Sequence, residues 1–122
     1  MRRVLLPVLA VALLVAGAAP ATAGTEAVSF VQVVEKEWSL VMSRTSVRAG
    51  RVTIEAVNFG TDAHDLVLQS KAKGSKPVRF KQMDPRGRTE RTLRLPAGRY
   101  ALWCSLPGHK AKGMKATLSV RG

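Results

Sequence analysis

The sequence predicts an all-β fold, a β-sandwich, on the strength of three observations. Apolar and polar residues alternate in several short runs, which is typical of half-buried strands. Gly and Pro recur between these runs, with 10 Gly and 6 Pro among the 122 residues. No stretch after residue 23 keeps a helical period. Short strands at regular spacing with turn residues between them are typical of a sandwich.

Residues 1–23 are expected to be a secretory signal peptide. Arg2 and Arg3 give a basic start, residues 4–19 are apolar, and Ala21-Thr22-Ala23 provides a small-x-small cleavage pattern. The apolar run contains a proline and is shorter than the roughly 20 residues of a membrane-spanning helix. We therefore expect cleavage after residue 23, with a retained membrane anchor as the alternative.

Residues 24–122 have the length of one domain with a single core. The expected strands cover residues 28–34, 38–42, 52–56, 64–68, 92–95, 100–104 and 114–120. A tight turn is expected at Pro96-Ala97-Gly98, because Pro fixes φ at its second position and Gly suits its fourth. Residues 71–88 contain two Gly and two Pro and are expected to be a loop with room for one helical turn.

Three side chains with metal-binding chemistry continue the apolar faces of these strands. Residues two apart in a strand point to the same face. His64 shares its parity with leucines at 66 and 68, Cys104 with apolar residues at 100 and 102, and Met114 with those at 116, 118 and 120. All three are therefore expected to point inward at one edge of the sandwich.

A fourth candidate, His109, lies between Cys104 and Met114. Pro107 and two glycines make a helix unfavourable there, so this segment is expected to be a loop that leaves one strand and returns to the next. One short loop thus supplies three candidate ligands. By contrast, Met42 is interpreted as a core residue and Met83 as a surface residue.

The donor types predict copper. The chain has one Cys, which in an exported protein must be buried, bonded to another chain or ligated. A lone inward His or Met is usually packing, but two His and one Cys with a weak axial Met are the signature of an electron-transfer copper site. Zinc uses thioether poorly, and calcium and magnesium prefer oxygen. The predicted ligands of one copper ion (Cu²⁺/Cu⁺) are His64, Cys104, His109 and Met114.

On these residues the chain resembles the cupredoxins, the small type 1 blue copper proteins that include plastocyanin, azurin and amicyanin. The motifs that match are Val47-x-Ala-Gly-x-Val-Thr-Ile, Asn58-x-Gly-x₃-His64 and Tyr100-x₃-Cys104-x₄-His109-x₄-Met114. The resemblance implies a Greek-key sandwich of seven or eight strands. Relatives commonly carry Asn after the first His, whereas this chain has Asp65, which is expected to accept a hydrogen bond from Ser105 or a nearby backbone N–H.

The predicted function is that of an exported one-electron carrier. The alternative is a copper carrier or buffer that hands over metal, although such proteins usually offer exposed ligands that exchange easily. An enzyme is not expected, because oxidases and nitrite reductases of this kind need a second copper centre and the chain has no further His.

The charge indicates the kind of partner. The net charge is +12, and residues 71–99 hold ten Lys or Arg against two acidic residues. A field this one-sided favours an acidic redox protein, such as a cytochrome or a membrane oxidase or reductase complex, and transient contact with an anionic membrane surface. Nucleic acid is not expected, since no aromatic stacking platform accompanies the basic residues. We expect the protein to be a monomer located in the periplasm or on the outer face of the cytoplasmic membrane. Its partner is expected to dock on the surface around His109. Trp103 is interpreted as a packing residue, with a second port for electrons as the alternative.

Overall fold

The computed structural model describes residues 16–21 and 23–122, which form nine strands and no helix. The strands are β1 (Ser29–Lys36), β2 (Ser39–Met42), β3 (Ser46–Arg48), β4 (Gly50–Asn58), β5 (Val67–Ser70), β6 (Val78–Arg79), β7 (Arg88–Leu95), β8 (Gly98–Trp103) and β9 (Lys115–Arg121). The expected count of seven or eight was too low. The two additional strands, β3 and β6, have three and two residues, too few to show an alternating pattern.

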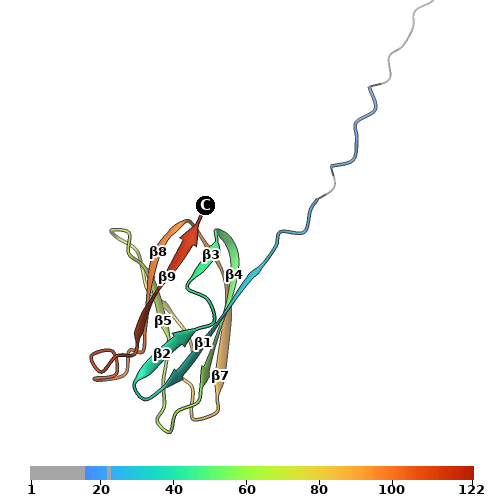
Figure 1. The fold of residues 1–122 in the computed structure, drawn as a ribbon. Helices are drawn as coiled ribbons and strands as arrows, with labels where there is room; N and C mark the ends of the chain where they lie inside the picture. The colour runs from blue at the N-terminus through green and yellow to red at the C-terminus, as the bar shows by residue number, and fades with distance from the viewer. Residues whose placement is uncertain (1–15, 22) are drawn as a thin grey trace, which may run out of the picture.

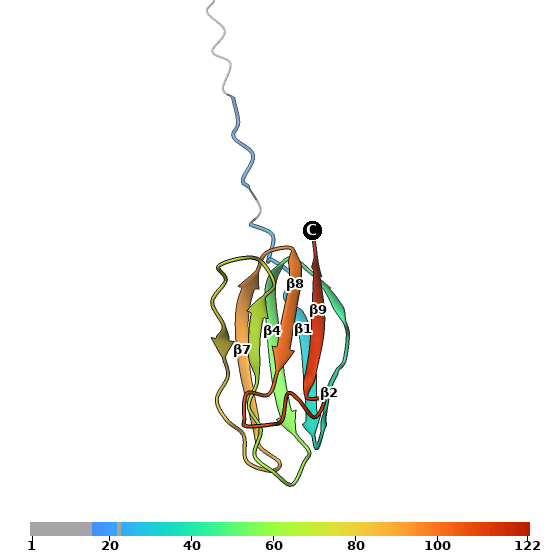
Figure 2. The same cartoon turned by 90° about the vertical axis from the view of Figure 1, so that its left-hand side faces the viewer.

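Two sheets face each other across the core (Figures 1 and 2). One has the strand order β2-β1-β4-β7 and the other β3-β9-β8-β5-β6. The chain crosses between the sheets before and after β3, after β4, and again after β6 and β7, so sequence neighbours are often in different sheets. β1 pairs with β4 in parallel, and β3 pairs with β9 in parallel, while the other pairs are antiparallel. The predicted Greek-key sandwich is confirmed.

The core consists of the inward residues that the alternation predicted. In β4 the inward residues Val52, Ile54 and Ala56 are fully buried, and in β8 the inward residues Tyr100 and Leu102 are buried. Their polar neighbours in sequence point away, as expected of strands with one face against the core. The same parity continues to Cys104 and Met114, which lie next to β8 and β9 and are fully buried, whereas His64 lies before β5 in a separate bridge to Met83.

Residues 71–88 are mostly loop, as predicted, and form no helical turn. The prediction that Met83 lies on the surface was wrong, because only 2% of this residue is exposed. Met83 and His64 exchange two backbone hydrogen bonds, of 2.8 and 3.1 Å, in an isolated antiparallel bridge. The bridge holds this loop against the segment that carries His64.

The segments that carry the four predicted copper ligands all lie at one end of the sandwich. β4 and β8 both end there, at Asn58 and Trp103, and β9 begins there at Lys115. The chain enters β1 and leaves β9 at the opposite end (Figure 1). Most of the predicted signal peptide, residues 1–15 and 22, lies outside the described residues. The described part of the chain holds no helix long and apolar enough to cross a membrane.

Candidate metal centre

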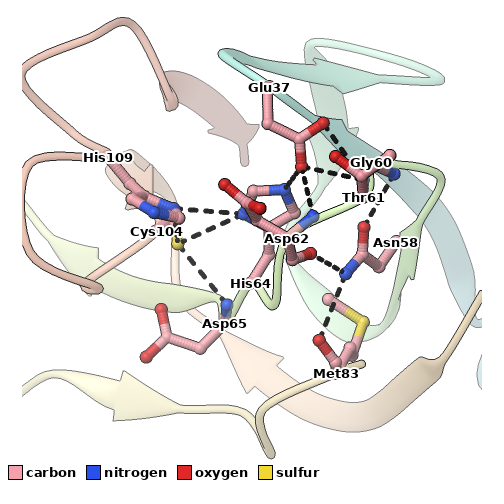
Figure 3. Close-up of polar contacts among 10 residues, drawn as sticks. All are labelled: Glu37, Asn58, Gly60, Thr61, Asp62, His64, Asp65, Met83, Cys104 and His109. Carbon is pink, nitrogen blue, oxygen red and sulfur yellow. Dashed lines mark hydrogen bonds and ion pairs between the residues drawn. The ribbon is translucent and has the colours of Figure 1, made fainter. Parts of the chain in front are cut away.

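The structure brings three of the four predicted ligands together at this end (Figure 3). His64 precedes β5, Cys104 follows β8 directly, and His109 lies in the loop between β8 and β9. The His64 Nδ1 and His109 Nδ1 atoms are 3.1 Å apart, and Cys104 Sγ lies 3.9 and 3.5 Å from them. His64 and Cys104 are fully buried, whereas His109 is partly exposed. Two imidazoles and one thiol therefore converge on one point near the surface.

Met114, the fourth predicted ligand, is fully buried directly before β9. Its backbone N–H donates to the His109 carbonyl at 3.2 Å, and its own carbonyl accepts from Cys104 N–H at 3.1 Å. These two bonds close the loop from Cys104 to Met114 on itself. Met114 is thus tied by its backbone to both of the other candidate ligands of this loop.

His64 is oriented by a residue from the turn between β1 and β2. Its Nε2 atom is 2.9 Å from Glu37 Oε1, so the ring presents Nε2 to a carboxylate and Nδ1 to Cys104 and His109 (Figure 3). Because an ionised carboxylate only accepts, Nε2 carries the proton, and in the neutral ring the lone pair is on Nδ1. The ring is therefore held in the tautomer that a metal at the cluster requires.

Backbone hydrogen bonds keep Glu37 ionised. Its carboxylate accepts from the N–H of Asp62 at 2.8 Å and of Thr61 at 3.0 Å. These hydrogen bonds lower the pKa of Glu37 to about 2, because they favour the charged form of the carboxyl group. The bond from Asp62 has the larger effect and the bond from Thr61 the next largest. The carboxylate is thus negatively charged at any pH at which the protein is expected to work.

The same turn also reaches the second His. The Trp38 ring meets the His109 ring edge to face, with centroids 4.9 Å apart. Lys112 Nζ lies 3.9 Å from the centroid of the Trp38 ring, and Lys110 Nζ lies 4.4 Å from that of Trp103. Two lysines of the ligand loop are thus placed over two Trp rings by cation–π contacts.

Asp65 ties the two ligand-bearing segments together, as expected. Its carboxylate accepts hydrogen bonds from the Ser105 N–H, at 2.6 Å, and from the Ser105 hydroxyl. The Asp65 N–H in turn points to Cys104 Sγ at 3.5 Å. Burial raises the pKa of the Cys104 thiol, so a thiolate there needs a cationic partner such as a metal ion.

Glu35 is a buried carboxyl group that the sequence interpretation did not single out. It is fully buried in β1, and neither of its carboxyl oxygens has a hydrogen-bond partner among residues 16–21 and 23–122. Burial, and secondarily the negative charge of Asp65, raises the pKa of Glu35 to about 8. The group is therefore uncharged in the folded protein at neutral pH, since burying an isolated carboxylate is costly.

This pKa predicts that the copper-free protein loses stability as the pH rises from about 5 to 8. In that window the folded state keeps the Glu35 proton, whereas the unfolded chain, with a pKa of 4.5, releases it. The slope due to this group approaches about 1.4 kcal/mol per pH unit. Urea unfolding at several pH values should show a smaller slope in Glu35→Gln and an unchanged slope in Glu90→Gln, an exposed control. Equal slopes in all three proteins would contradict the prediction.

Five residues of this end were missed or misplaced by sequence reasoning: Glu35, Glu37, Trp38, Met83, and Asn58, whose side chain is hydrogen-bonded to the backbone of Gly60, Asp62 and Met83. Glu35 could have been found, because it continues the inward parity of Val31 and Val33, but the strand was expected to stop at residue 34. Glu37 has no such signal, since it meets His64 through a turn 27 residues away in sequence.

No family model matches the sequence, and comparison with curated proteins finds no similar sequence. Comparison with solved structures shows that the sandwich has the cupredoxin fold. Auracyanin A of Chloroflexus aurantiacus, described as a "blue" copper protein, has a TM-score of 0.63 and 18% identity, over 78% of this chain and 100% of that chain. Rusticyanin of Thiobacillus ferrooxidans has a TM-score of 0.59 and 20% identity, over 77% of each chain.

One similar structure comes from a different class. A multicopper oxidase has a TM-score of 0.59 and 12% identity over 75% of this chain, but the match covers only 44% of the oxidase. The shared part is therefore less than half of that protein. At these identities the comparisons define the fold, and the chemistry must be argued from the residues of this chain.

Proposed function

We propose that the protein is a one-electron carrier that holds one copper ion between His64, Cys104, His109 and Met114. The observation that supports this most directly is the convergence of two imidazole Nδ1 atoms and one thiol at separations of 3.1 to 3.9 Å. Bound copper would supply the chemistry, cycling between Cu(II) and Cu(I). The similar fold of a "blue" copper protein supports the same assignment.

The donors fit copper better than other metals. The cluster combines a buried thiol with two imidazoles, and the fully buried Met114 is tied to the same loop. Structural zinc sites use four firm ligands, and oxygen-seeking metals have no match in this donor set. The closed backbone of the loop and the contacts of Glu37 and Asp65 hold the donors in place, which favours little rearrangement between oxidation states.

The test is to add one equivalent of Cu(II) to the purified protein and record absorption, electron paramagnetic resonance and voltammetry. An intense blue band, narrow copper hyperfine splitting and a reversible one-electron wave are expected of a thiolate-bound electron-transfer site. A pale solution with an ordinary Cu(II) signal, or colourless reduction to Cu(I), would overturn the proposal of an electron carrier. It would favour the alternative, a protein that carries or buffers copper.

Asp65 is expected to lower the midpoint potential of the site. Its carboxylate places a negative charge beside Cys104, through the bonds to Ser105, and negative charge favours Cu(II) over Cu(I). Asp65→Asn keeps an oxygen acceptor for the Ser105 N–H and removes the charge, so voltammetry should record a higher potential. No rise in potential would count against this role.

We expect the partner to be an acidic redox protein that docks beside His109. An open groove of about 480 Å³ is lined by Trp103, Leu106, Pro107, Lys110 and Lys115, together with neighbouring loop residues. It combines apolar surface with positive charge, and Lys71 extends the charge into an adjoining groove. Stopped-flow electron transfer with an acidic cytochrome should slow at least about tenfold from low salt to roughly 0.5 M, because steering is screened. A rate independent of salt would contradict charge steering.

We further propose that residues 24–122 are exported to the periplasm or the outer face of the cytoplasmic membrane and act as a monomer without enzymatic activity. The basic, apolar and small-residue pattern of residues 1–23 supports export. Both His of the chain are in the cluster, so none is left to build the second copper centre of an oxidase. The basic surface also suits transient contact with anionic lipid.

A further inference from the structure

We propose that Glu37 is a positioning residue for His64: its carboxylate fixes the ring tautomer and places one negative charge behind this ligand, which stabilises oxidised copper. The inference rests on the proposed function and extends it, because it names the group that tunes the site. No ligand motif of the sequence includes Glu37. It acts on the copper through His64 and is not itself a ligand.

The Glu37 carboxylate is hydrogen-bonded both to His64 and to the backbone of the loop that carries His64. Glu37 Oε1 lies 2.9 Å from His64 Nε2, and the same oxygen accepts from Asp62 N–H at 2.8 Å and Thr61 N–H at 3.0 Å (Figure 3). The carboxylate is thus held by backbone and cannot swing away freely. His64 is fully buried, while the Glu37 side chain is 22% exposed, so the pair closes the site from outside.

Two glycines make room for the turn that carries this carboxylate. A Cβ atom at Gly60 would collide with the Glu37 carboxylate. On the other side, Gly113 has φ +126°, and a Cβ there would lie 2.8 Å from the Trp38 carbonyl oxygen. Both ligand-bearing loops therefore carry glycine where they receive the turn at Glu37 and Trp38. Gly113 thus leaves room for the backbone of the turn, and Gly60 leaves room for the Glu37 carboxylate in the position where it contacts His64.

The chemistry follows from the hydrogen bond. A carboxylate that accepts from Nε2 leaves the lone pair on Nδ1, which faces Cys104 and His109, and increases the basicity of the ring. A more basic imidazole and a nearby negative charge both favour the more highly charged metal ion. Glu37 therefore lowers the midpoint potential and strengthens the binding of Cu(II) more than that of Cu(I).

The variants Glu37→Gln and Glu37→Ala separate the two roles. The Gln side chain can place its oxygen where Oε1 lies and keep all three contacts without the charge, whereas Ala loses both. We expect the Cu(II) affinity to fall about 10- to 100-fold in Glu37→Ala and less in Glu37→Gln. Each tenfold loss confined to Cu(II) raises the one-electron potential by about 59 mV. Glu90→Gln, which removes an exposed carboxylate of β7, is the matched control and should leave the potential unchanged.

A second readout uses the copper-free protein. Nitrogen NMR should show His64 with its proton on Nε2 in the wild type and in Glu37→Gln, and a mixture of tautomers in Glu37→Ala. An unchanged His64 spectrum in Glu37→Ala, or a potential of Glu37→Gln equal to that of the wild type, would overturn the inference. If the wild type shows no thiolate-copper spectrum, the proposed function fails, and the copper-free spectra then decide the positioning of His64 alone.

Discussion

Replacing Cys104 with Ser is expected to abolish the intense blue absorption of the copper-loaded protein. Cys104 is the only Cys of the chain, and its sulfur lies 3.5 and 3.9 Å from the Nδ1 atoms of the two His. A serine hydroxyl is a hard ligand that stays protonated, so the site would lose its soft thiolate ligand. Absorption and paramagnetic resonance spectra after addition of one equivalent of Cu(II) should show an ordinary Cu(II) signal, and the reversible wave should disappear.

The control for this variant is Ser105→Ala, which alters the next residue and leaves all four proposed ligands in place. It should retain the blue band, although it removes the hydroxyl donor to Asp65. Circular dichroism of both copper-free variants should match that of the wild type, since Cys104→Ser changes one atom of a buried side chain. A Cys104→Ser protein that stays blue would exclude thiolate ligation.

The largest effect on stability is expected from Asn58→Ala, at about 3 kcal/mol. Asn58 is fully buried at the end of β4. Its amide donates to the carbonyls of Asp62, at 2.8 Å, and Met83, at 3.1 Å, and its oxygen accepts from Gly60 N–H at 2.8 Å. Removing the side chain loses these three hydrogen bonds, at about 1 kcal/mol each, and leaves a gap at a fully buried position, although the Met83 carbonyl keeps its bond from the His64 N–H. Urea unfolding of the copper-free protein measures the loss.

Gln32→Ala is the matched control, because Gln32 is a half-buried amide whose side chain donates to Glu55 at 2.9 Å. It should lose less than about 1 kcal/mol, the usual net value of one such bond. Asn58→Ala should also weaken copper binding, because Met83, which pairs with His64, is one of the groups that Asn58 holds. A loss below about 1 kcal/mol in Asn58→Ala would contradict the proposed anchoring of these loops.

The fold and the converging donors were predictable because the signals behind them are local. Strand parity depends only on the alternation of neighbouring residues, and it placed His64, Cys104 and Met114 on the inner face, where the structure has them. The short loop from Cys104 to Met114 limits where His109 can lie, so its proximity to Cys104 also follows from sequence.

The supporting contacts were not predictable for a physical reason. Glu37 meets His64, and Asn58 holds Met83, only after turns and crossovers bring distant segments to the same end of the sandwich. The turn at Glu37 and the loop at Met83 lack periodicity, and their positions depend on backbone hydrogen bonds that almost any residue can make. Met83 shows the result: an irregular Gly- and Pro-containing loop suggested the surface, whereas a two-bond bridge to His64 buries it.

The entry of the chain at the end opposite the metal centre has a consequence for attachment. β4 has nine residues, and at about 3.3 Å per residue it spans roughly 30 Å between the two ends. A protein immobilised through its N-terminal side on a lipid bilayer or an electrode would present His109 outward. A soluble partner could then reach the copper freely, whereas an electrode on the attached side would face a gap too wide for fast tunnelling. For direct electrochemistry, the attachment should therefore be at the end that carries His109 but outside the ligand loop from Cys104 to Met114, so that the site lies near the conductor and stays intact.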